Sequence, residues 1–262
     1  MKNKLKFQVL TDLAEAIIAD SKDILGSYAE SYVYKSDNDA VTSRDLALQA
    51  IIKSEIKKVD PQVPVYSEED DLSSMNADIG WLVDPLDGTS NFLQGLKYQA
   101  ISIAKLEKGE IQCALVIDLD NFDVYTAIKS AGAQLNGSSI SINTPKIHLV
   151  GTSTGFVRAS QRYSDAEIPG GINLRILGSQ ALQLCFVATG QFIGNVSLEA
   201  KAWDDVAGAL IVREAGGNYS MCGGVEERWF EMAKAGTSLR SVAFGRGVNK
   251  MIVDYVERVF NV

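Results

Sequence analysis

Apolar residues in the first sixty positions recur at the spacing of an α-helix. Between residues 5 and 34 they lie three or four positions apart, which predicts one or two amphipathic helices with Gly26 as the weakest point. A polar loop at 36–39 follows, and a second helix is predicted over 43–59. That helix has its apolar residues on one face and is expected to end at Asp60-Pro61, because proline cannot continue a helix.

Shorter apolar runs follow this helical region, and they predict strands. Lys108-Gly109 is a turn between two of these runs, and Asn136-Gly137 is a strong signal for a further hairpin. The first half of the chain is therefore expected to be α+β, with two helices against a mostly antiparallel sheet. Its predicted strands lie at 63–66, 80–83, 100–106, 111–117 and 122–128.

The second half begins without a Gly/Ser-rich linker, so the expected domain boundary is soft. We place an N-terminal α+β domain at 1–140, carrying most of the candidate ligands, and a C-terminal α/β domain at 141–262. Inside one predicted helix, Ala207-Gly208-Ala209 indicates close approach of another backbone. Strands are predicted at 148–153 and 193–197, and helices at 180–189, 204–215 and 248–260.

Size, charge and cysteine content limit the classes of protein to consider. A chain of 262 residues, of which 46% are hydrophobic, can bury a large core. The net charge of −8 argues against a nucleic-acid partner, and acidic residues interrupt the N-terminal stretch, so neither a signal peptide nor a membrane span is predicted. Three widely spaced cysteines fit no disulfide framework, which favours the cytoplasm. The single histidine, His148, excludes a His-rich metal site.

The segment 81–92 has the strongest chemical signal. The strand before it is expected to end at Asp84-Pro85, and Asp87-Gly88 is a turn after which Thr89 or Ser90 could cap a helix. Both acidic dipeptides are also common in ordinary turns. Two carboxylates beside a helix amino end would instead bind a cation through their oxygens and an anion through backbone N–H groups. A metal-bound phosphate satisfies both preferences.

Two other acidic strings admit both a structural and a functional interpretation. Glu68-Glu69-Asp70 would ordinarily be a solvated loop, and Asp204 would ordinarily be an acid that meets the dipole of a helix start. Together with 81–92, the strings 67–70 and 203–217 resemble the signatures of the inositol monophosphatase family, which belongs to a larger group of magnesium-dependent, lithium-sensitive phosphatases. The resemblance covers nearly the whole chain. It implies a layered α-β-α-β-α sandwich of the sugar-phosphatase type, with mixed, largely antiparallel sheets, and a homodimer.

The resemblance also implies how a metal centre would be built. Counting from Trp203 favours Asp204 over Asp205 as the matching acid. Oxygen ligands without histidine or cysteine suit Mg²⁺ better than Zn²⁺, and four acids in one pocket would raise one another's pKa values until a cation binds. Two or three Mg²⁺ ions would be held by Glu68, Asp84, the backbone carbonyl of Leu86, Asp87 and Asp204.

Catalytic and substrate-binding roles follow from the same resemblance. Thr89 matches the threonine that orients the attacking water, assisted by Glu68 and Asp45. Asp45 also has capping-box spacing to Thr42, so its structural and catalytic roles both stay open. The backbone amides of Gly88 and Thr89 would hold the phosphate. Substrate contacts are expected from Leu86, Asp87, Gly88, Thr89, Arg175, Gly178, Ser179 and Asp204.

These inferences predict Mg²⁺-dependent hydrolysis of a small phosphate monoester, either inositol monophosphate or a similar polyol phosphate. Ser197 lies six residues before Trp203, where many inositol phosphatases have a glutamate that contacts substrate hydroxyls, and Glu199 is displaced from that position by two. This departure leaves the identity of the polyol open. The alternatives are a 3′(2′),5′-bisphosphate nucleotidase and a non-catalytic phosphometabolite-binding regulator. The expected partner is a small phosphorylated metabolite, not a nucleic acid or a membrane.

Overall fold

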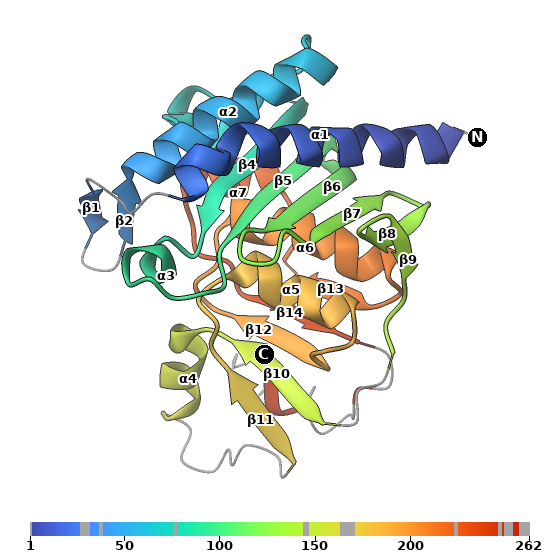
Figure 1. Cartoon of the computed structure of the whole chain (residues 1–262). Helices are drawn as coiled ribbons and strands as arrows, with labels where there is room; N and C mark the ends of the chain where they lie inside the picture. The colour runs from blue at the N-terminus through green and yellow to red at the C-terminus, as the bar shows by residue number, and fades with distance from the viewer. Residues whose placement is uncertain are drawn as a thin grey trace.

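The chain folds into five alternating layers of helices and sheets (Figure 1). The computed structural model describes residues 2–26, 32–36, 39–75, 78–143, 147–162, 171–222, 225–245, 248 and 254–256. From one side to the other, the layers are a helix pair, a seven-stranded sheet, a second helix pair, a five-stranded sheet and a short helix. The predicted α-β-α-β-α sandwich with mixed, largely antiparallel sheets is confirmed.

The outer helix pair consists of α1 (Lys2–Leu25) and α2 (Ser43–Val59). The predicted range 5–34 was too long for α1, and residues 27–31 lie outside the described part of the chain. The strand β1 (Tyr32–Ser36) follows and pairs with β2 (Asp39–Thr42). Tyr32-Val33-Tyr34 is a β-branched and aromatic run, which favours a strand. The polar loop predicted at 36–39 falls largely on residues 37 and 38, which are not described.

The second predicted helix, 43–59, is confirmed at both ends. Thr42 caps α2, and its hydroxyl accepts hydrogen bonds from the backbone N–H groups of Arg44 and Asp45. Asp45 Oδ2 in turn accepts a 2.8 Å hydrogen bond from the backbone N–H of Thr42, which completes the capping box. The cap therefore orients the Asp45 carboxylate as well as starting the helix.

The seven-stranded sheet is antiparallel except where β3 and β4 run parallel. Both predicted hairpin turns are confirmed: Lys108-Gly109 and Asn136-Gly137 have positive φ angles throughout, the conformation that a two-residue hairpin turn requires. In spatial order the strands are β3 (Val65–Ser67), β4 (Ile79–Asp87), β5 (Ala100–Glu107), β6 (Glu110–Asp118), β7 (Val124–Ile128), β8 (Gly132–Leu135) and β9 (Ser138–Ile140).

Strand β4 is longer than its sequence indicates. The prediction that it ends at Asp84-Pro85 is wrong, because pairing with β5 resumes at Asp87, opposite Ala100. The register shifts between Asp84 and Asp87, so Pro85 sits in an irregularity where its missing N–H breaks no ladder hydrogen bond. Both aspartates therefore belong to one rigid strand end.

The inner helices α5 (Gln180–Ala188) and α6 (Ala202–Glu214) lie between the two sheets. Several short elements of the second half were missed, since strands of four residues and helices of seven have too few apolar repeats to show a period. They are β11, β13, β14, α4 (Thr154–Ser160) and α7 (Trp229–Ala235). The five-stranded sheet has the order β11 (Ile172–Arg175), β10 (His148–Thr152), β12 (Gly194–Ser197), β14 (Ser241–Phe244) and β13 (Asn218–Met221).

The structure describes only part of the last predicted helix. Within 248–260, residues 254–256 are helical, and Tyr255 and Val256 are buried against the five-stranded sheet. The remainder of that prediction falls outside the described residues, apart from residue 248. No helix in the described ranges is both long and apolar enough to cross a membrane.

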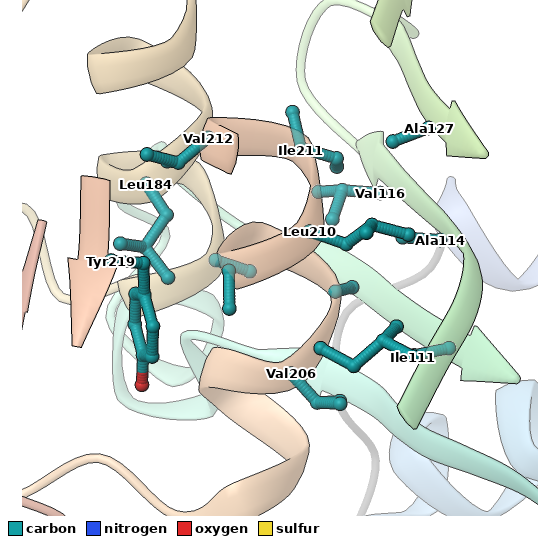
Figure 2. Packing of buried hydrophobic residues seen from close by; sticks show 14 of the residues in the cluster. Ile111, Ala114, Val116, Ala127, Leu184, Val206, Leu210, Ile211, Val212 and Tyr219 are labelled. Carbon is teal, nitrogen blue, oxygen red and sulfur yellow. The ribbon is translucent and has the colours of Figure 1, made fainter. Parts of the chain in front are cut away.

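Burial alternates along the strands so that each face of the seven-stranded sheet has its own core. Trp81 and Val83 of β4 pack toward α1 and α2, whereas Leu82 between them packs toward α5 and α6. Figure 2 shows the second of these cores, where Leu210 of α6 points toward the strand that carries Ala114 and Val116, and Leu184 of the neighbouring helix lies on the other side of α6. The middle helices therefore contact both sheets and fix their separation.

Helix α6 approaches α5 most closely at Gly208. A Cβ atom built at Gly208 would lie 2.5 Å from Leu184 Cδ1 and 2.6 Å from Leu184 Cβ. These distances are shorter than van der Waals contact allows, so only glycine fits here. The close approach expected from Ala207-Gly208-Ala209 is confirmed, with a side chain of α5 as the neighbour.

We expect Gly208→Ala to lower the free energy of unfolding by about 1–3 kcal/mol, the usual cost of overpacking a core, although alanine favours helix formation by ~1 kcal/mol. Urea denaturation followed by circular dichroism measures the change. Gly26→Ala is the matched control, because a Cβ there would meet its nearest neighbour at 3.6 Å. Wild-type stability in Gly208→Ala would contradict the packing argument.

Candidate functional site

Acidic residues from three distant stretches meet at the carboxyl end of β4. Asp84 and Asp87 are buried there, and the backbone N–H of Glu68 donates a 3.0 Å hydrogen bond to the carbonyl of Val83. Ser102 pairs with Asp84 across the β4–β5 ladder and donates a 2.8 Å hydrogen bond to the carbonyl of Trp203. This bond ties the amino end of α6, and with it Asp204, to the same strand end.

Each aspartate of this group has one carboxylate oxygen held by a hydrogen bond. Asp84 Oδ1 accepts from the backbone N–H of Leu86 at 2.9 Å, and Asp204 Oδ2 accepts from the backbone N–H of Lys201 at 2.7 Å. Asp87 Oδ2 accepts from Ser179 Oγ at 2.6 Å and from the backbone N–H of Ala181 at 2.7 Å. Ser179 and Ala181, which donate to Asp87, lie at the amino end of α5. The positive end of that helix dipole therefore also points at the site.

Burial and mutual repulsion act on these carboxylates in the same direction. Burial raises the pKa of Asp84 well above its usual range, and the neighbouring charges of Glu68, Asp204 and Asp87 raise it further. The pKa of Asp204 is raised by burial and then by Asp87 and Glu68. Burial raises the pKa of Asp87 to about 6, against the lowering effect of its hydrogen bonds from Ser179 and the backbone. The protein holds several negative charges together at an energetic cost.

The donor set suits a hard cation, because the potential ligands described at this strand end are oxygen atoms of carboxylates, carbonyls and hydroxyls. Hydrogen-bonded carboxylates are also typical of metal sites, where such bonds orient the ligands. Within the described residues, however, no group of three or more His, Cys, Asp or Glu side chains is arranged to hold a metal ion as it stands. The residues fit a divalent cation in chemistry and charge, and closing around one would require side-chain rotation.

A hydroxyl and a second buried carboxylate lie beside the acidic group. Thr89 Oγ1 is 3.1 Å from Asp45 Oδ1 and 2.9 Å from the carbonyl oxygen of Leu86. Asp45 Oδ2 accepts from Thr42, so its Oδ1 is turned toward Thr89 by the capping box. Burial raises the pKa of Asp45, and its hydrogen bonds from Thr42 and Thr89 oppose that shift. The capping contact and the threonine contact predicted for Asp45 exist together.

The start of α3 (Thr89–Leu93) differs from the sequence prediction. Gly88, not Thr89 or Ser90, occupies the cap position, with φ of 95°. A Cβ at Gly88 would lie 2.6 Å from the carbonyl oxygen of Tyr98, so both the backbone angle and the space require glycine. The Thr89 side chain is therefore free of the capping role and points at Asp45 instead.

A cavity of about 190 Å³ opens next to Asp87 and Asp204. Of the three residues expected to contact the substrate from this stretch, Gly178 and Ser179 line the cavity and Arg175 does not. Arg175 is exposed at the end of β11 and donates to the carbonyl of its neighbour Leu174. The other lining residues, which the sequence did not indicate except for Ser197 and Glu199, are Thr152, Ser153, Thr154, Ile176, Gln180, Gln183, Ser197, Glu199 and Ala200.

The side-chain amide of Asn91, on α3, forms hydrogen bonds to the loop beside this cavity. Asn91 Nδ2 lies 2.7 Å from the carbonyl oxygen of Leu177 and 2.9 Å from that of Tyr98. A Cβ at Gly178 would lie 2.7 Å from the Asn91 amide, so glycine at this position permits the contact. Asn91 thereby holds the loop before α5 against the helix that carries Thr89.

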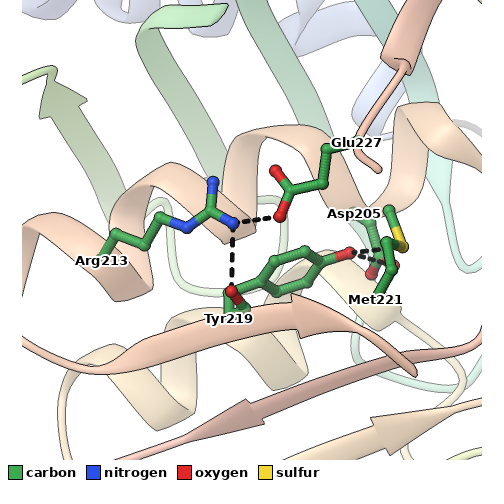
Figure 3. A network of polar contacts seen from close by, with 5 residues as sticks. All are labelled: Asp205, Arg213, Tyr219, Met221 and Glu227. Carbon is green, nitrogen blue, oxygen red and sulfur yellow. Dashed lines mark hydrogen bonds and ion pairs between the residues drawn. The ribbon is translucent and has the colours of Figure 1, made fainter. Parts of the chain in front are cut away.

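Asp205 has hydrogen-bond partners of its own, although its charge contributes to the raised pKa values of Asp87 and Asp204. It is fully buried and accepts hydrogen bonds from Gln180 Nε2 at 2.6 Å and from Tyr219 Oη at 2.8 Å. Figure 3 shows the contact between Tyr219 and Asp205, and it also shows Arg213, which donates to the Tyr219 carbonyl and pairs with Glu227. Asp204 instead lines the cavity with Asp87, so the two adjacent aspartates face different surroundings.

Comparisons with known proteins match most of the chain. The model of the Inositol monophosphatase family matches residues 5–247. The chain is 39% identical to the Nus factor SuhB of Escherichia coli strain K12 over 193 residues, covering 70% of this chain and 72% of that protein. It is 37% identical to the Nus factor SuhB of Salmonella typhimurium strain LT2 over 210 residues, covering 73% and 78%.

Solved structures show the same fold. An IMPase from Thermotoga maritima matches with a TM-score of 0.78 and 26% identity, over 99% of this chain and 98% of that one. An IMPase/NADP phosphatase, solved with NADP and Ca²⁺, matches with a TM-score of 0.81 over 99% and 96%. Its identity of 19% makes it a likeness of fold alone.

We expect the chelator-treated protein to lose stability as the pH rises from about 4 to about 6. The Asp87 pKa is about 6 in the fold and about 4 when unfolded. The folded state therefore holds a proton that the unfolded state has released, so stability falls across this window, by about 3 kcal/mol from Asp87 alone.

Urea denaturation in EDTA at several pH values from 4.5 to 7 measures this loss. Asp87→Asn is the matched variant, because its amide oxygen can still accept from Ser179 while the titrating group is gone. We expect its pH dependence to be shallower than that of the wild type. Parallel curves for the two proteins would show that Asp87 does not titrate in this range.

Proposed function

Since the chain belongs to the inositol monophosphatase family, we propose that it hydrolyses a small phosphate monoester with Mg²⁺ as its cofactor. The family is metal-dependent, and membership supports phosphatase chemistry in general. The observation that carries the proposal is the gathering of Glu68, Asp84, Asp87 and Asp204 beside the Thr89–Asp45 pair and next to a cavity. If these acids belonged only to an ordinary turn or a solvated loop, the aspartates would not need to be buried together, and the Thr89 hydroxyl would not need to lie beside them.

Bound divalent cations would supply a more acidic water and would neutralise the charge on the phosphoryl oxygens. The ligands we propose are Glu68, Asp84, Asp87, Asp204 and the carbonyl of Leu86. In each of the three aspartates, one carboxylate oxygen accepts a hydrogen bond from the protein. Rotation of the side chain about that bond would turn the other carboxylate oxygen toward the cation. The repulsion that raises the pKa values of Asp84 and Asp204 would be relieved when the cation binds.

Thr89 and Asp45 would position the attacking water. Asp45 is held by the cap of α2 and accepts the hydrogen bond of the Thr89 hydroxyl, whose own oxygen lone pairs are then directed outward. A water that donates to Thr89 Oγ1 would have its nucleophilic oxygen oriented toward the phosphorus. The backbone N–H groups of Gly88 and Thr89, at the start of α3, would hold the phosphate.

The cavity supports a neutral leaving group. Among the described residues that line it, none is a lysine or an arginine, and Glu199 adds a negative charge. A second phosphate usually needs cationic side chains for recognition. The lining therefore favours an inositol monophosphate or a similar polyol phosphate over a 3′(2′),5′-bisphosphate, which is the alternative within the same chemistry. The non-catalytic regulator is less well supported, because a binder has no need of the Thr89–Asp45 pair.

Further properties belong to the same proposal. We propose a cytoplasmic homodimer that is sensitive to lithium, binding two or three Mg²⁺ ions and a small phosphorylated metabolite. The free state of Cys113, Cys185 and Cys222 supports a reducing compartment. Family resemblance supports the dimer and the lithium sensitivity.

A second candidate function comes from the names of the relatives. Several proteins that are 36–39% identical to this chain are called Nus factor SuhB. We propose as the alternative that this chain is also a Nus factor, which would bind RNA polymerase. Co-elution of the purified chain with RNA polymerase tests this role, and it can be positive whether or not the chain hydrolyses phosphates.

We expect Thr89→Ala to lower kcat for inositol 1-phosphate by about 10²–10³-fold, because groups that orient a reacting water contribute on that order. The wild type should release phosphate with Mg²⁺ and not with EDTA. Ser90→Ala is the matched control, since Ser90 is exposed on the same helix and has no assigned role. Equal turnover in Thr89→Ala and Ser90→Ala, or turnover in EDTA, would refute the mechanism.

A further inference from the structure

Asp205 is a buried carboxylate to which the proposed function gives no role. It is fully buried, and its oxygens accept hydrogen bonds from Gln180 Nε2 at 2.6 Å and from Tyr219 Oη at 2.8 Å. Burial raises the pKa of Asp205, and its hydrogen bonds from Gln180, Ser241 and Tyr219 oppose that shift. These donors, an amide and two hydroxyls, favour the ionised carboxylate but carry no positive charge to balance it.

Two basic side chains that lie near Asp205 in the sequence or in Figure 3 are engaged elsewhere. Arg213 forms an ion pair with Glu227 (Figure 3). Lys201 Nζ donates to the carbonyl of Gly236 at 2.7 Å. In the described part of the chain, no lysine or arginine forms an ion pair with Asp205. A buried charge that is not paired lowers the stability of a fold, so Asp205 is costly unless a cation balances it.

The charge of Asp205 reaches the acidic group, although its side chain does not line the cavity. Asp205 follows Asp204 at the start of α6, and its negative charge contributes to the raised pKa values of Asp204 and Asp87. Those two aspartates line the cavity, and Asp205 is not among the lining residues. Charges inside a protein act on one another over several ångströms with little screening. Asp205 can therefore influence a cation that it does not touch.

A hydrogen bond also connects Asp205 to the donors of Asp87. Gln180 stands between Ser179 and Ala181, which donate to Asp87 Oδ2 at 2.6 and 2.7 Å. The hydrogen bond from Gln180 Nε2 to Asp205 Oδ1 holds the first turn of α5 against the first turn of α6. This contact fixes Asp205 relative to Asp87, so its charge acts from a constant position.

We propose that Asp205 is a fixed negative charge behind the acidic group, which strengthens the binding of a divalent cation there without coordinating it. The assignment rests on the proposed function, because it needs the divalent cation proposed at Asp84, Asp87 and Asp204. A dication at that position attracts the Asp205 carboxylate through the protein interior and balances a charge that the described residues leave unpaired. Removal of this one charge should therefore weaken cation binding and stabilise the protein when no cation is present.

Calorimetric titration of Mg²⁺ into the wild type and Asp205→Asn measures the effect of the charge. Asparagine has the size of aspartate, and its amide can still accept from Gln180 and donate to Tyr219. We expect Asp205→Asn to raise the Kd for Mg²⁺ about 10-fold, the lower end of the usual effect of altering a group that surrounds a metal site. Asp12→Asn removes the same charge from an exposed position on α1 and should leave the Kd unchanged. Equal Kd values for the wild type and Asp205→Asn would overturn the proposal.

Thermal melts in EDTA and in Mg²⁺ separate an effect of the charge from a purely structural role. Because the charge is unpaired without a cation, Asp205→Asn should raise the melting temperature in EDTA and reduce the further rise that Mg²⁺ causes. A carboxylate needed only for packing α5 against α6 would instead make the variant less stable in EDTA. A lower melting temperature in EDTA together with an undiminished rise in Mg²⁺ would overturn the proposal.

Tyr219→Phe is the matched variant for the hydrogen bonds, because it removes one donor to Asp205 and keeps the charge. We expect it to lower the melting temperature in EDTA, since a buried acceptor loses a partner, and to leave the Kd for Mg²⁺ within about twofold of the wild-type value. A loss of Mg²⁺ affinity equal to that of Asp205→Asn would assign the effect to the hydrogen-bonded geometry and would refute a role of the charge.

Phosphate release from inositol 1-phosphate, measured on the same preparations, separates this role of Asp205 from the proposed function. If the wild type binds Mg²⁺ and releases phosphate while Asp205→Asn binds Mg²⁺ equally well, the phosphatase proposal stands and the role of Asp205 is wrong. If the wild type binds Mg²⁺ and releases no phosphate, the phosphatase proposal fails, and the two Kd values still decide the role of Asp205. Absence of Mg²⁺ binding to the wild type would refute both.

Discussion

Repulsion among buried carboxylates is the constraint on which this structure depends. Burial raises the pKa values of Asp84 and Asp204, and the neighbouring charges of Asp87 and Glu68 raise both further. Such an arrangement lowers the stability of the fold unless hydrogen bonds or a cation compensate. The protein directs backbone N–H groups at three of these carboxylates, from Leu86, Ala181 and Lys201. The elements around the site are arranged to supply these donors.

The layered architecture explains how the donors reach the acids. Helices α5 and α6 lie between the two sheets, and both have their amino ends at the carboxyl end of β4. Gly208 allows the two helices to pack closely enough for both ends to reach one strand. A hydrogen bond from Gln180 to Asp205 links the first turns of the same two helices. The hydrophobic core and the acidic site therefore share one pair of helices.

Sequence reasoning succeeded where a local rule determines local structure. The capping box at Thr42 and Asp45, the two glycine turns and the long periodic helix α2 were predicted because each depends on neighbouring residues alone. The end of β4 was mispredicted, since an irregular register accommodates Pro85 only when β5 is present. The exposure of Arg175 depends on long-range packing and leaves no pattern in the sequence.

Asn91 has a consequence for how this chain can be divided. Its amide crosses from α3 to the Leu177 carbonyl, and the bonds from Ser102 to Trp203 and from Ser179 to Asp87 cross in the same way between residues before 140 and residues after 141. A chimaera that joined one half of this chain to the other half of a relative would have to preserve all three contacts at once. Exchange of either half alone would displace the acidic residues before it altered the packing of the hydrophobic cores. The sequences of the two halves are therefore constrained to change together.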